Sequence, residues 1–366
     1  MLPNCQECPL KGTTKVFSSG KPANFNGLVI VESFPSLSDV EAQKLFTSSA
    51  GYVLSVCATE NKIEKNEIFL TSAIACHIPK NLKPKLWKKA IECCSPRLKA
   101  ELDEIKPTKI LALGKQALFA LAPPKEKLSL WWGASLPSPY GEFMPSFSHI
   151  DLLGRPALIP VARRVFKRCL STRRWVWPRA VATTDVGATT AALEELRRSG
   201  LPLAVDIENV GDPLHSRIRC IGVATKELGV SVPTEPSIHL DHRQLLQKMF
   251  CDPKRMKVFH NGQHDILGLE SHGYTFSGPI EDTLLLHSVI APQLPHSLGF
   301  CAAAEFAAER WKSDFGEDEN KGGKKGTSLD KFVSSPLPRL MLYNVKDALM
   351  TALLYERFMY YAGTTF

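Results

Sequence analysis

The chain has 366 residues, of which 44% are hydrophobic and 22% charged, which suffices for about two folded domains and excludes a globally disordered protein. The formal net charge of +8 suits a polyanionic partner wherever the basic residues cluster. No apolar stretch approaches the length of a membrane span, and the first residues lack a secretory signal pattern, so we expect a soluble, cytoplasmic protein.

The first half of the chain alternates short apolar runs with helix-like segments. Strands are predicted at residues 28–31, 67–74 and 109–113. Helices are predicted at residues 39–59, around Cys93 and Cys94, at 115–121 and at 155–170. Such alternation predicts a parallel α/β sheet. Residues 123–145 are rich in proline, glycine and tryptophan, and we expect them to be irregular.

Six of the ten cysteines fall in the first 94 residues. Cys5 and Cys8 have a two-residue gap that lets both thiolates face one metal centre from a single turn. Cys76 and Cys94 follow, and four thiolates suit either zinc or a four-iron cluster. The alternative is that Cys76 and Cys94 are small buried apolar residues. Cys93 is a weaker substitute for Cys94.

These segments resemble the iron–sulfur uracil-DNA glycosylases over about residues 1–170. The matching pieces are C-x2-C-P-L-K at 5–11, V-E-S-F-P at 31–35, I-F-L-T-S at 68–72, C-S-P-R-L at 94–98 and K-I-L-A-L-G at 109–114. The resemblance implies a glycosylase-like α/β domain. It also implies a 4Fe–4S cluster held by Cys5, Cys8, Cys76 and Cys94, with zinc as the alternative.

The residues that this family uses on the base are replaced here. Ser72 stands in place of the asparagine that reads the uracil edge, and Met144 in place of the histidine that supports the leaving base, while Glu32 and Phe46 are kept. A flipped base must be read by hydrogen bonds to its edge. We therefore expect a retained scaffold with a lost or badly weakened glycosylase activity. The lysines that can still contact DNA are Lys80, Lys83, Lys85, Lys88 and Lys89.

A basic stretch from Arg163 to Arg179 contains seven arginines and lysines, no acid, and two tryptophans, Trp175 and Trp177. One interpretation is a nucleic-acid surface with aromatic rings available for stacking. The alternative, which we favour for the tryptophans, is a solvated helix with buried rings. We place a domain boundary near residue 171.

The second half has its own alternation of elements. Strands are predicted at residues 177–183, 203–208, 218–224, 228–233 and 257–259. Helices are predicted at 190–198, with Gly200 as a C-terminal cap, and at 242–250, 266–272, 284–290 and 340–360. Residues 312–330 are polar and glycine-rich, and a mobile loop is expected there.

Several acids of this half are placed to meet. Asp206 and Glu208 project from one face of a strand, although an ordinary strand end with solvated acids is the alternative. Asp265 follows a strand directly, and Tyr343 and Asp347 share a helix face. Four carboxylates together need cations, and hard oxygen ligands select magnesium or manganese. Two such ions about 4 Å apart support phosphodiester cleavage.

This pattern resembles the tyrosine branch of the DEDD exonucleases, which includes the proofreading domain of family A DNA polymerases. The matching pieces are D-I-E at 206–208, H-N-G-Q-H-D at 260–265, E-D-T at 281–283 and Y-N-V-K-D at 343–347, within about 172–366. The resemblance implies a ribonuclease-H-like fold and 3′→5′ removal of nucleotides.

By that resemblance Asp206, Glu208 and Asp347 hold one metal ion, and Asp206 and Asp265 lie near the second. Tyr343 orients the attacking water, and Asn261 lies near the substrate. Asp282 is a rival ligand, although its place at a helix start more simply predicts a capping role.

Together these patterns predict a glycosylase-like domain at residues 1–170 and a 3′→5′ DNA exonuclease domain at 171–366. The pairing suits a phage-type replication protein whose partners are DNA and a polymerase domain or subunit. No polymerase domain follows Phe366, so we expect no polymerisation by this chain. The alternatives are a non-catalytic DNA-binding module that assists a polymerase and an active uracil-DNA glycosylase.

Overall fold

The structure is a computed structural model that describes residues 5–79, 81–122, 132–171, 175–210, 217–235, 237–306, 308, 311 and 335–365. These residues form two compact units, the first made mainly of residues up to Trp175 and the second mainly of residues from Val176 onward. Within the described ranges, no helix combines the length and apolarity needed to cross a membrane.

The first unit contains a five-stranded sheet in the order β2-β1-β3-β5-β4. All neighbouring strands are parallel except the edge pair β4–β5, so the predicted parallel α/β sheet is confirmed. The strands are β1 (Leu28–Glu32), β2 (Phe69–Ser72), β3 (Lys109–Leu113), β4 (Leu136–Ser138) and β5 (Gly141–Ser146).

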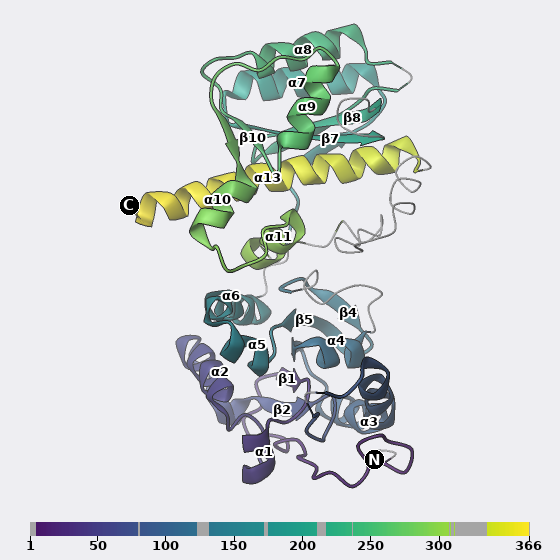
Figure 1. Cartoon of the computed structure of the whole chain (residues 1–366), viewed down its shortest axis with the longest axis vertical. Coiled ribbons are helices and arrows are strands. Elements are labelled where there is room, and N and C mark those ends of the chain that lie inside the picture. Colours follow the sequence, from purple (N-terminus) through teal and green to yellow (C-terminus); the bar gives the residue numbers. More distant parts are fainter. Residues whose placement is uncertain are drawn as a thin grey trace. The chain divides into compact units, whose positions relative to one another are not determined.

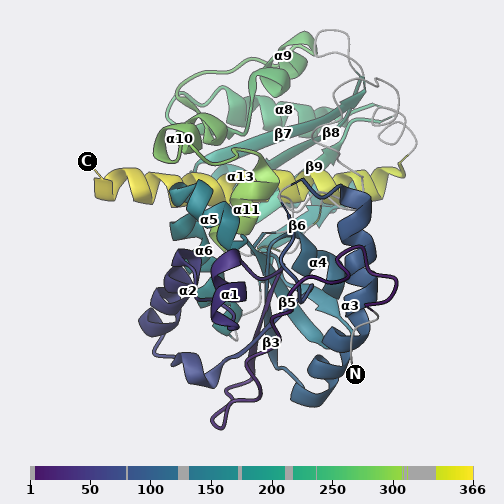
Figure 2. The same cartoon turned by 60° about the horizontal axis from the view of Figure 1, so that its bottom comes forward.

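Helices cover both faces of this sheet (Figure 2). Helices α3 and α4 pack on the face to which Val29 and Val31 point, and α2, α5 and α6 lie on the other. The helices are α1 (Leu37–Ala42), α2 (Ser49–Glu60), α3 (Pro84–Ile105), α4 (Lys115–Leu121), α5 (His149–Gly154) and α6 (Ile159–Leu170), with 3-10 turns at Lys65–Glu67 and Pro156–Leu158.

Two expectations for this unit are wrong. The single helix predicted at 39–59 is two helices, because Gln43 and Phe46 adopt left-handed backbone conformations between them. A Cβ at Gly51 would lie 2.1 Å from the Phe46 carbonyl oxygen, so the close return of the chain requires glycine there.

The second wrong expectation is that residues 123–145 are irregular. Residues 136–146 form a hairpin made of β4 and β5. Ser138 accepts a hydrogen bond from Tyr140 N and donates one to Gly141 O, and Gly141 has a φ of 112°. These contacts close the turn between β4 and β5.

The second unit contains a six-stranded sheet in the order β11-β10-β7-β8-β9-β6. β8 runs antiparallel to both of its neighbours, and the other neighbouring pairs are parallel. The strands are β6 (Arg179–Ala182), β7 (Leu203–Val210), β8 (Arg217–Ala224), β9 (Leu228–Pro233), β10 (Lys257–Phe259) and β11 (Ile280–Asp282).

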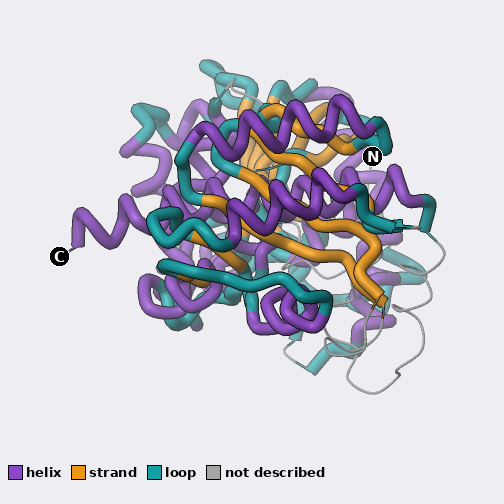
Figure 3. Tube along the Cα trace, turned by 90° about the horizontal axis from the view of Figure 1, so that it is seen from above, coloured by secondary structure: helices purple, strands orange, loops and turns teal. Residues whose placement is uncertain are grey.

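Helix α13 runs along one face of this sheet, and α7, α8 and α9 lie on the other (Figure 1). The view from above in Figure 3 shows helices passing over these strands. The helices are α7 (Val186–Ser199), α8 (Leu240–Phe250), α9 (Gln263–Ser271), α10 (Thr283–Ile290), α11 (Leu298–Phe306) and α13 (Leu337–Thr365).

The residues of β7 alternate between the two layers. Leu203, Val205 and Ile207 belong to the core shared with α7 and α8, whereas Ala204 packs with α13. Asp206 and Glu208 have the parity of Ala204 and therefore face the α13 layer.

Most predicted elements of this unit are present, and Gly200 ends α7 with a φ of 63° as expected. β11 and α11 were not predicted. The loop expected at 312–330 lies outside the described residues.

Candidate functional site

Three carboxylates meet where β7 faces α13. One ligand oxygen from each of Asp206, Glu208 and Asp347 can be chosen so that all three lie within 4.8 Å of one another. Asp347 is 4% exposed, and it lies 139 residues after Glu208 and 141 after Asp206 in the chain. Like charges this close favour a bound cation between them, and oxygen ligands suit a hard divalent ion.

Asp265 lies beside this group, in the first turn of α9. Its Oδ1 accepts a hydrogen bond from the backbone N–H of Ile207, the residue between the two acids of β7, at 3.0 Å. Burial raises the pKa of Asp265 to about 7, and the acids Asp282 and Asp347 contribute to the rise. The three-carboxylate cluster does not include Asp265, but its carboxyl is held against the same stretch of β7.

Asp282, the rival ligand, has a structural role in the described contacts. Its carboxylate accepts from the N–H groups of Asn261 at 3.0 Å, Gly262 at 2.8 Å and Leu284 at 2.8 Å. It therefore caps α10 and fixes the turn that leads into α9 and Asp265.

Asn261 occupies that turn with a φ of 62°, a left-handed conformation that asparagine tolerates better than most residues. Its side chain is exposed at the end of β10. It is thus accessible to a substrate.

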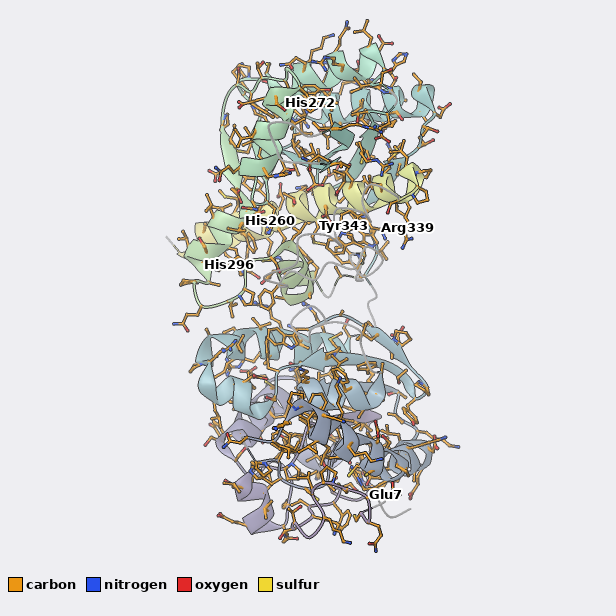
Figure 4. All side chains as sticks on the ribbon, turned by 45° about the vertical axis from the view of Figure 1, so that its right-hand side comes forward. Glu7, His260, His272, His296, Arg339 and Tyr343 are labelled. Atoms are coloured by element: carbon orange, nitrogen blue, oxygen red, sulfur yellow. The ribbon has the colours of Figure 1, made fainter. Side chains whose placement is uncertain are left out.

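Tyr343 lies on α13, one turn before Asp347 and one turn after Arg339 (Figure 4). Its side chain is 4% exposed. The predicted sharing of one helix face by Tyr343 and Asp347 is therefore present in the structure.

Two residues that contact these acids were not singled out from the sequence. The indole N–H of Trp311 donates to Asp347 Oδ1. Asn344 Nδ2 donates to Asp206 Oδ2 at 2.8 Å. The sequence does contain a signal for Asn344, because this amide stands three residues before Asp347 among apolar residues of the same helix. In the structure the Asn344 side chain is fully buried.

The basic stretch Arg163–Arg179 is in part neutralised by ion pairs. Arg163 pairs with Glu60 at 3.2 Å, and Arg179 pairs with Glu195. Trp177 is half-buried against Trp311, with ring centroids 5.1 Å apart. These contacts support the interpretation that Trp177 packs inside the protein rather than serving as a stacking surface for nucleic acid.

The thiols of the first unit line one small cavity. Five cysteines contribute to its wall: Cys5, Cys8, Cys76, Cys93 and Cys94. The four predicted ligands are thus brought together, and Cys93 joins them. A wall of thiols is the donor set that zinc or an iron–sulfur cluster requires. Burial raises the pKa of Cys76, Cys93 and Cys94, so metal binding there must release protons.

The positions that differ from the glycosylase pattern are all buried. Of the replaced positions, Ser72 is 1% exposed and Met144 is 8% exposed, and the retained Glu32 is 1% exposed. Arg97 also enters this region, since its guanidinium donates to Thr71 Oγ1 at 3.1 Å and to the Ser72 carbonyl.

The predicted DNA-contacting lysines are exposed where the structure describes them, at residues 83, 85, 88 and 89. Lys88 Nζ lies 5.2 Å from the centroid of the Phe119 ring, and Lys115 Nζ lies 5.5 Å from that of Trp87. Lys80 lies outside the described residues.

Two family models match this chain. Residues 18–161 match the model of the uracil DNA glycosylase superfamily, and residues 181–360 match a 3′–5′ exonuclease family model.

Two curated relatives match part of the first unit. The type-4 uracil-DNA glycosylase of Pyrobaculum aerophilum is 30% identical over 121 residues, which are 33% of this chain and 61% of that protein. The type-4 enzyme of Thermotoga maritima is 26% identical over 114 residues, which are 31% of this chain and 58% of that protein. The chain therefore spans about three fifths of the length of these relatives.

Among solved structures, Escherichia coli RNase D is similar with a TM-score of 0.36 and 15% identity, covering 52% of this chain and 46% of that one. Brucella melitensis NrnC with bound Mg²⁺ is similar with a TM-score of 0.35 and 14% identity, covering 52% of this chain and 85% of that one.

Proposed function

We propose that this chain, which joins a domain of the uracil DNA glycosylase superfamily to a 3′–5′ exonuclease domain, removes nucleotides from the 3′ end of DNA by metal-dependent hydrolysis. The observation that carries the proposal is the meeting of Asp206, Glu208 and Asp347 within 4.8 Å. We place the boundary between the two functional domains near residue 171.

The acids fit two magnesium or manganese ions. In this assignment Asp206, Glu208 and Asp347 hold one ion, and Asp206 and Asp265 hold the second. Bound divalent cations supply the positive charge that lowers the pKa of a water molecule and stabilises a leaving oxygen. The buried carboxyl of Asp265, whose nearby charges are acidic, fits such a role because a cation would favour its ionised form.

Other side chains of the second unit bind and orient the reactants. Tyr343 precedes Asp347 by one turn, so its hydroxyl is assigned the task of orienting the attacking water. Asn261, exposed beside Asp265, is assigned to contact the terminal nucleotide. Asp282 keeps Asn261 and Asp265 in place by holding the backbone of the turn between β10 and α9.

The first unit acts in this proposal as a scaffold that binds DNA. Cys5, Cys8, Cys76 and Cys94 would hold a 4Fe–4S cluster, with zinc as the alternative. The bound group would cross-link the N-terminal segment to α3 and to the segment that follows β2. The exposed lysines 83 and 88 are assigned to the DNA backbone, and Lys80 is assigned with them from the sequence. The expected protein partner is a DNA polymerase domain or subunit.

A strand-polarity digestion tests the proposal. Single strands labelled at the 5′ end should give a ladder of shortened products with Mg²⁺, whereas strands labelled at the 3′ end should release the label as a mononucleotide at once. EDTA should abolish both results. Asp206→Ala protein that degrades DNA as fast as wild type would show that the site assignment is wrong.

Uracil excision is the second candidate function, because the curated relatives of the first unit are uracil-DNA glycosylases. The replacements at Ser72 and Met144 argue against it. Formation of abasic sites in uracil-containing DNA distinguishes the two candidates.

A further inference from the structure

Asn344 is a buried amide whose hydrogen-bonding groups join three parts of the second unit. Its side chain has 0% exposure on the face of α13 that packs against the sheet. Oδ1 accepts from Ser231 Oγ at 2.7 Å, and Nδ2 donates to Asp206 at its Oδ2, 2.8 Å away, and at its carbonyl oxygen, 3.2 Å away. A buried amide engaged at both ends has one fixed orientation.

The strand register explains how one side chain reaches both partners. Asp206 of β7 pairs with Gly222 of β8, and Gly222 pairs with Ser231 of β9, so the three residues lie in a row across the sheet. The Asn344 side chain lies over Gly222, the middle residue of this row, and reaches Ser231 at one end and Asp206 at the other. A Cβ at Gly222 would lie 2.7 Å from Asn344 Oδ1 and 3.0 Å from Nδ2, so the missing side chain makes the space for the amide.

This arrangement acts on the acid that the proposed function assigns to both metal ions. The N–H group presents the positive end of a dipole to Asp206 Oδ2, which holds the carboxylate in one rotamer beside Glu208 and Asp347. A donor at this point also offsets part of the repulsion among the three carboxylates. Ser231 takes part indirectly, because its hydroxyl holds the other end of the amide.

We propose that Asn344 is a positioning residue that orients Asp206 for metal binding, with Ser231 acting through it. This inference rests on the proposed function, since it concerns the same metal site. Asn344 is not itself placed on the substrate. A purely structural role, in which the amide only fastens α13 to the sheet, would lower stability and leave metal binding unchanged.

The test measures metal binding directly, without substrate. The free Mn²⁺ signal in electron paramagnetic resonance is followed while protein is added, and the melting temperature of each variant is recorded alongside. For Asn344→Leu, which removes the donor with little change in volume, we expect the Mn²⁺ dissociation constant to rise about tenfold, as hydrogen bonds to charged groups are strong. Ser231→Ala should raise it by a smaller factor.

The double variant separates indirect action from simple damage. Because Ser231 is inferred to act only through Asn344, adding Ser231→Ala to Asn344→Leu should leave the Mn²⁺ dissociation constant where the single change put it. Thr351→Val provides the matched control. Like Ser231→Ala it removes a hydroxyl from a buried residue, because Thr351, on α13, is 1% exposed. It should change the melting temperature but not Mn²⁺ binding.

The outcomes distinguish this inference from the function on which it rests. Wild-type protein that neither binds Mn²⁺ nor releases nucleotides overturns the proposed function, and the inference with it. If wild type does both, and Asn344→Leu and Ser231→Ala bind Mn²⁺ as wild type does, only the positioning role is wrong. Should Asn344→Leu fail to fold, Ser231→Ala decides alone, and its unchanged Mn²⁺ binding overturns the inference.

Discussion

Trp311 contacts the candidate metal site through a single polar atom. Its indole N–H donates to Asp347 Oδ1, and the ring also packs on Trp177. The ring and the N–H group can therefore be tested separately, because phenylalanine keeps an aromatic ring and lacks the donor.

We predict that Trp311→Phe raises the Mg²⁺ concentration needed for half-maximal DNA hydrolysis by about tenfold, because Asp347 loses a hydrogen bond made to a charged group. The measurement is the initial rate of nucleotide release over a Mg²⁺ titration. Trp132→Phe is the control, since Trp132 is an equally buried tryptophan of the first unit. Equal Mg²⁺ requirements for both variants would refute the role of the Trp311 N–H.

The raised pKa of Asp265 makes the stability of the metal-free protein depend on pH. Burial and neighbouring acids raise this pKa from 3.8 to about 7. The folded state therefore favours the protonated carboxyl. The free energy of unfolding that depends on the protonated Asp265 carboxyl is fully present below about pH 4, and it is lost as the pH rises towards 7.

We predict that Asp265→Asn raises the melting temperature of the EDTA-treated protein more at pH 8 than at pH 5.5, by about twofold. Asparagine keeps an oxygen to accept the Ile207 N–H group and carries no charge at either pH. Thermal melts at the two pH values measure the difference. A stabilisation of the same size at both values would contradict the assignment of the raised pKa to Asp265.

At the scale of elements, two N-terminal caps of similar chemistry have different surroundings. Asp282 caps α10 and also holds the backbone of Asn261 and Gly262, next to Asp265. Asp185 caps α7 through Ala188 N at 2.7 Å, and its hydrogen bonds within the described residues are to Thr183 and to α7 rather than to the acid cluster.

We predict that Asp282→Ala and Asp185→Ala each cost about 1 kcal/mol or more of stability through the lost cap. Only Asp282→Ala should also reduce the rate of nucleotide release, by about tenfold to a hundredfold, because the turn that presents Asp265 loosens. Urea denaturation and single-turnover digestion measure the two effects. An Asp185→Ala protein that lost as much activity would show that stability alone controls the rate.

How far the sequence predicts these elements depends on whether their determinants are local. The alternation that puts Asp206 and Glu208 on one face, and the four-residue spacing of Tyr343 and Asp347, are local and were recognised. The break between α1 and α2 depends on the packing of Gly51 against the Phe46 carbonyl, which no local pattern specifies. Likewise, Asn344 acquires its role from Ser231 and Asp206, which lie 113 and 138 residues away in the chain.

At the scale of the whole molecule, the two units differ in which chemical groups they retain. In the second unit three of the four predicted acids, Asp206, Glu208 and Asp347, lie within 4.8 Å of one another. In the first unit five cysteines line one cavity. The two positions that the resemblance assigns to uracil recognition hold Ser72 and Met144. We therefore infer that the first unit keeps a glycosylase-like scaffold without the base-reading side chains.

We predict that the protein leaves uracil in DNA intact. A thioether offers a weak acceptor and no donor, so Met144 cannot support a leaving base, and Ser72 carries a hydroxyl in place of the two-sided amide that reads a uracil edge. The measurement is strand breakage at uracil after alkali treatment of a uracil-containing duplex. Because digestion from the 3′ end would obscure such breaks, the assay uses Asp206→Ala protein in EDTA, with a thymine-containing duplex as the control. Alkali-sensitive breaks confined to the uracil strand would establish glycosylase activity. The first unit would then be a second catalytic domain rather than a DNA-binding scaffold, with a base-reading mechanism that differs from the one its sequence has lost.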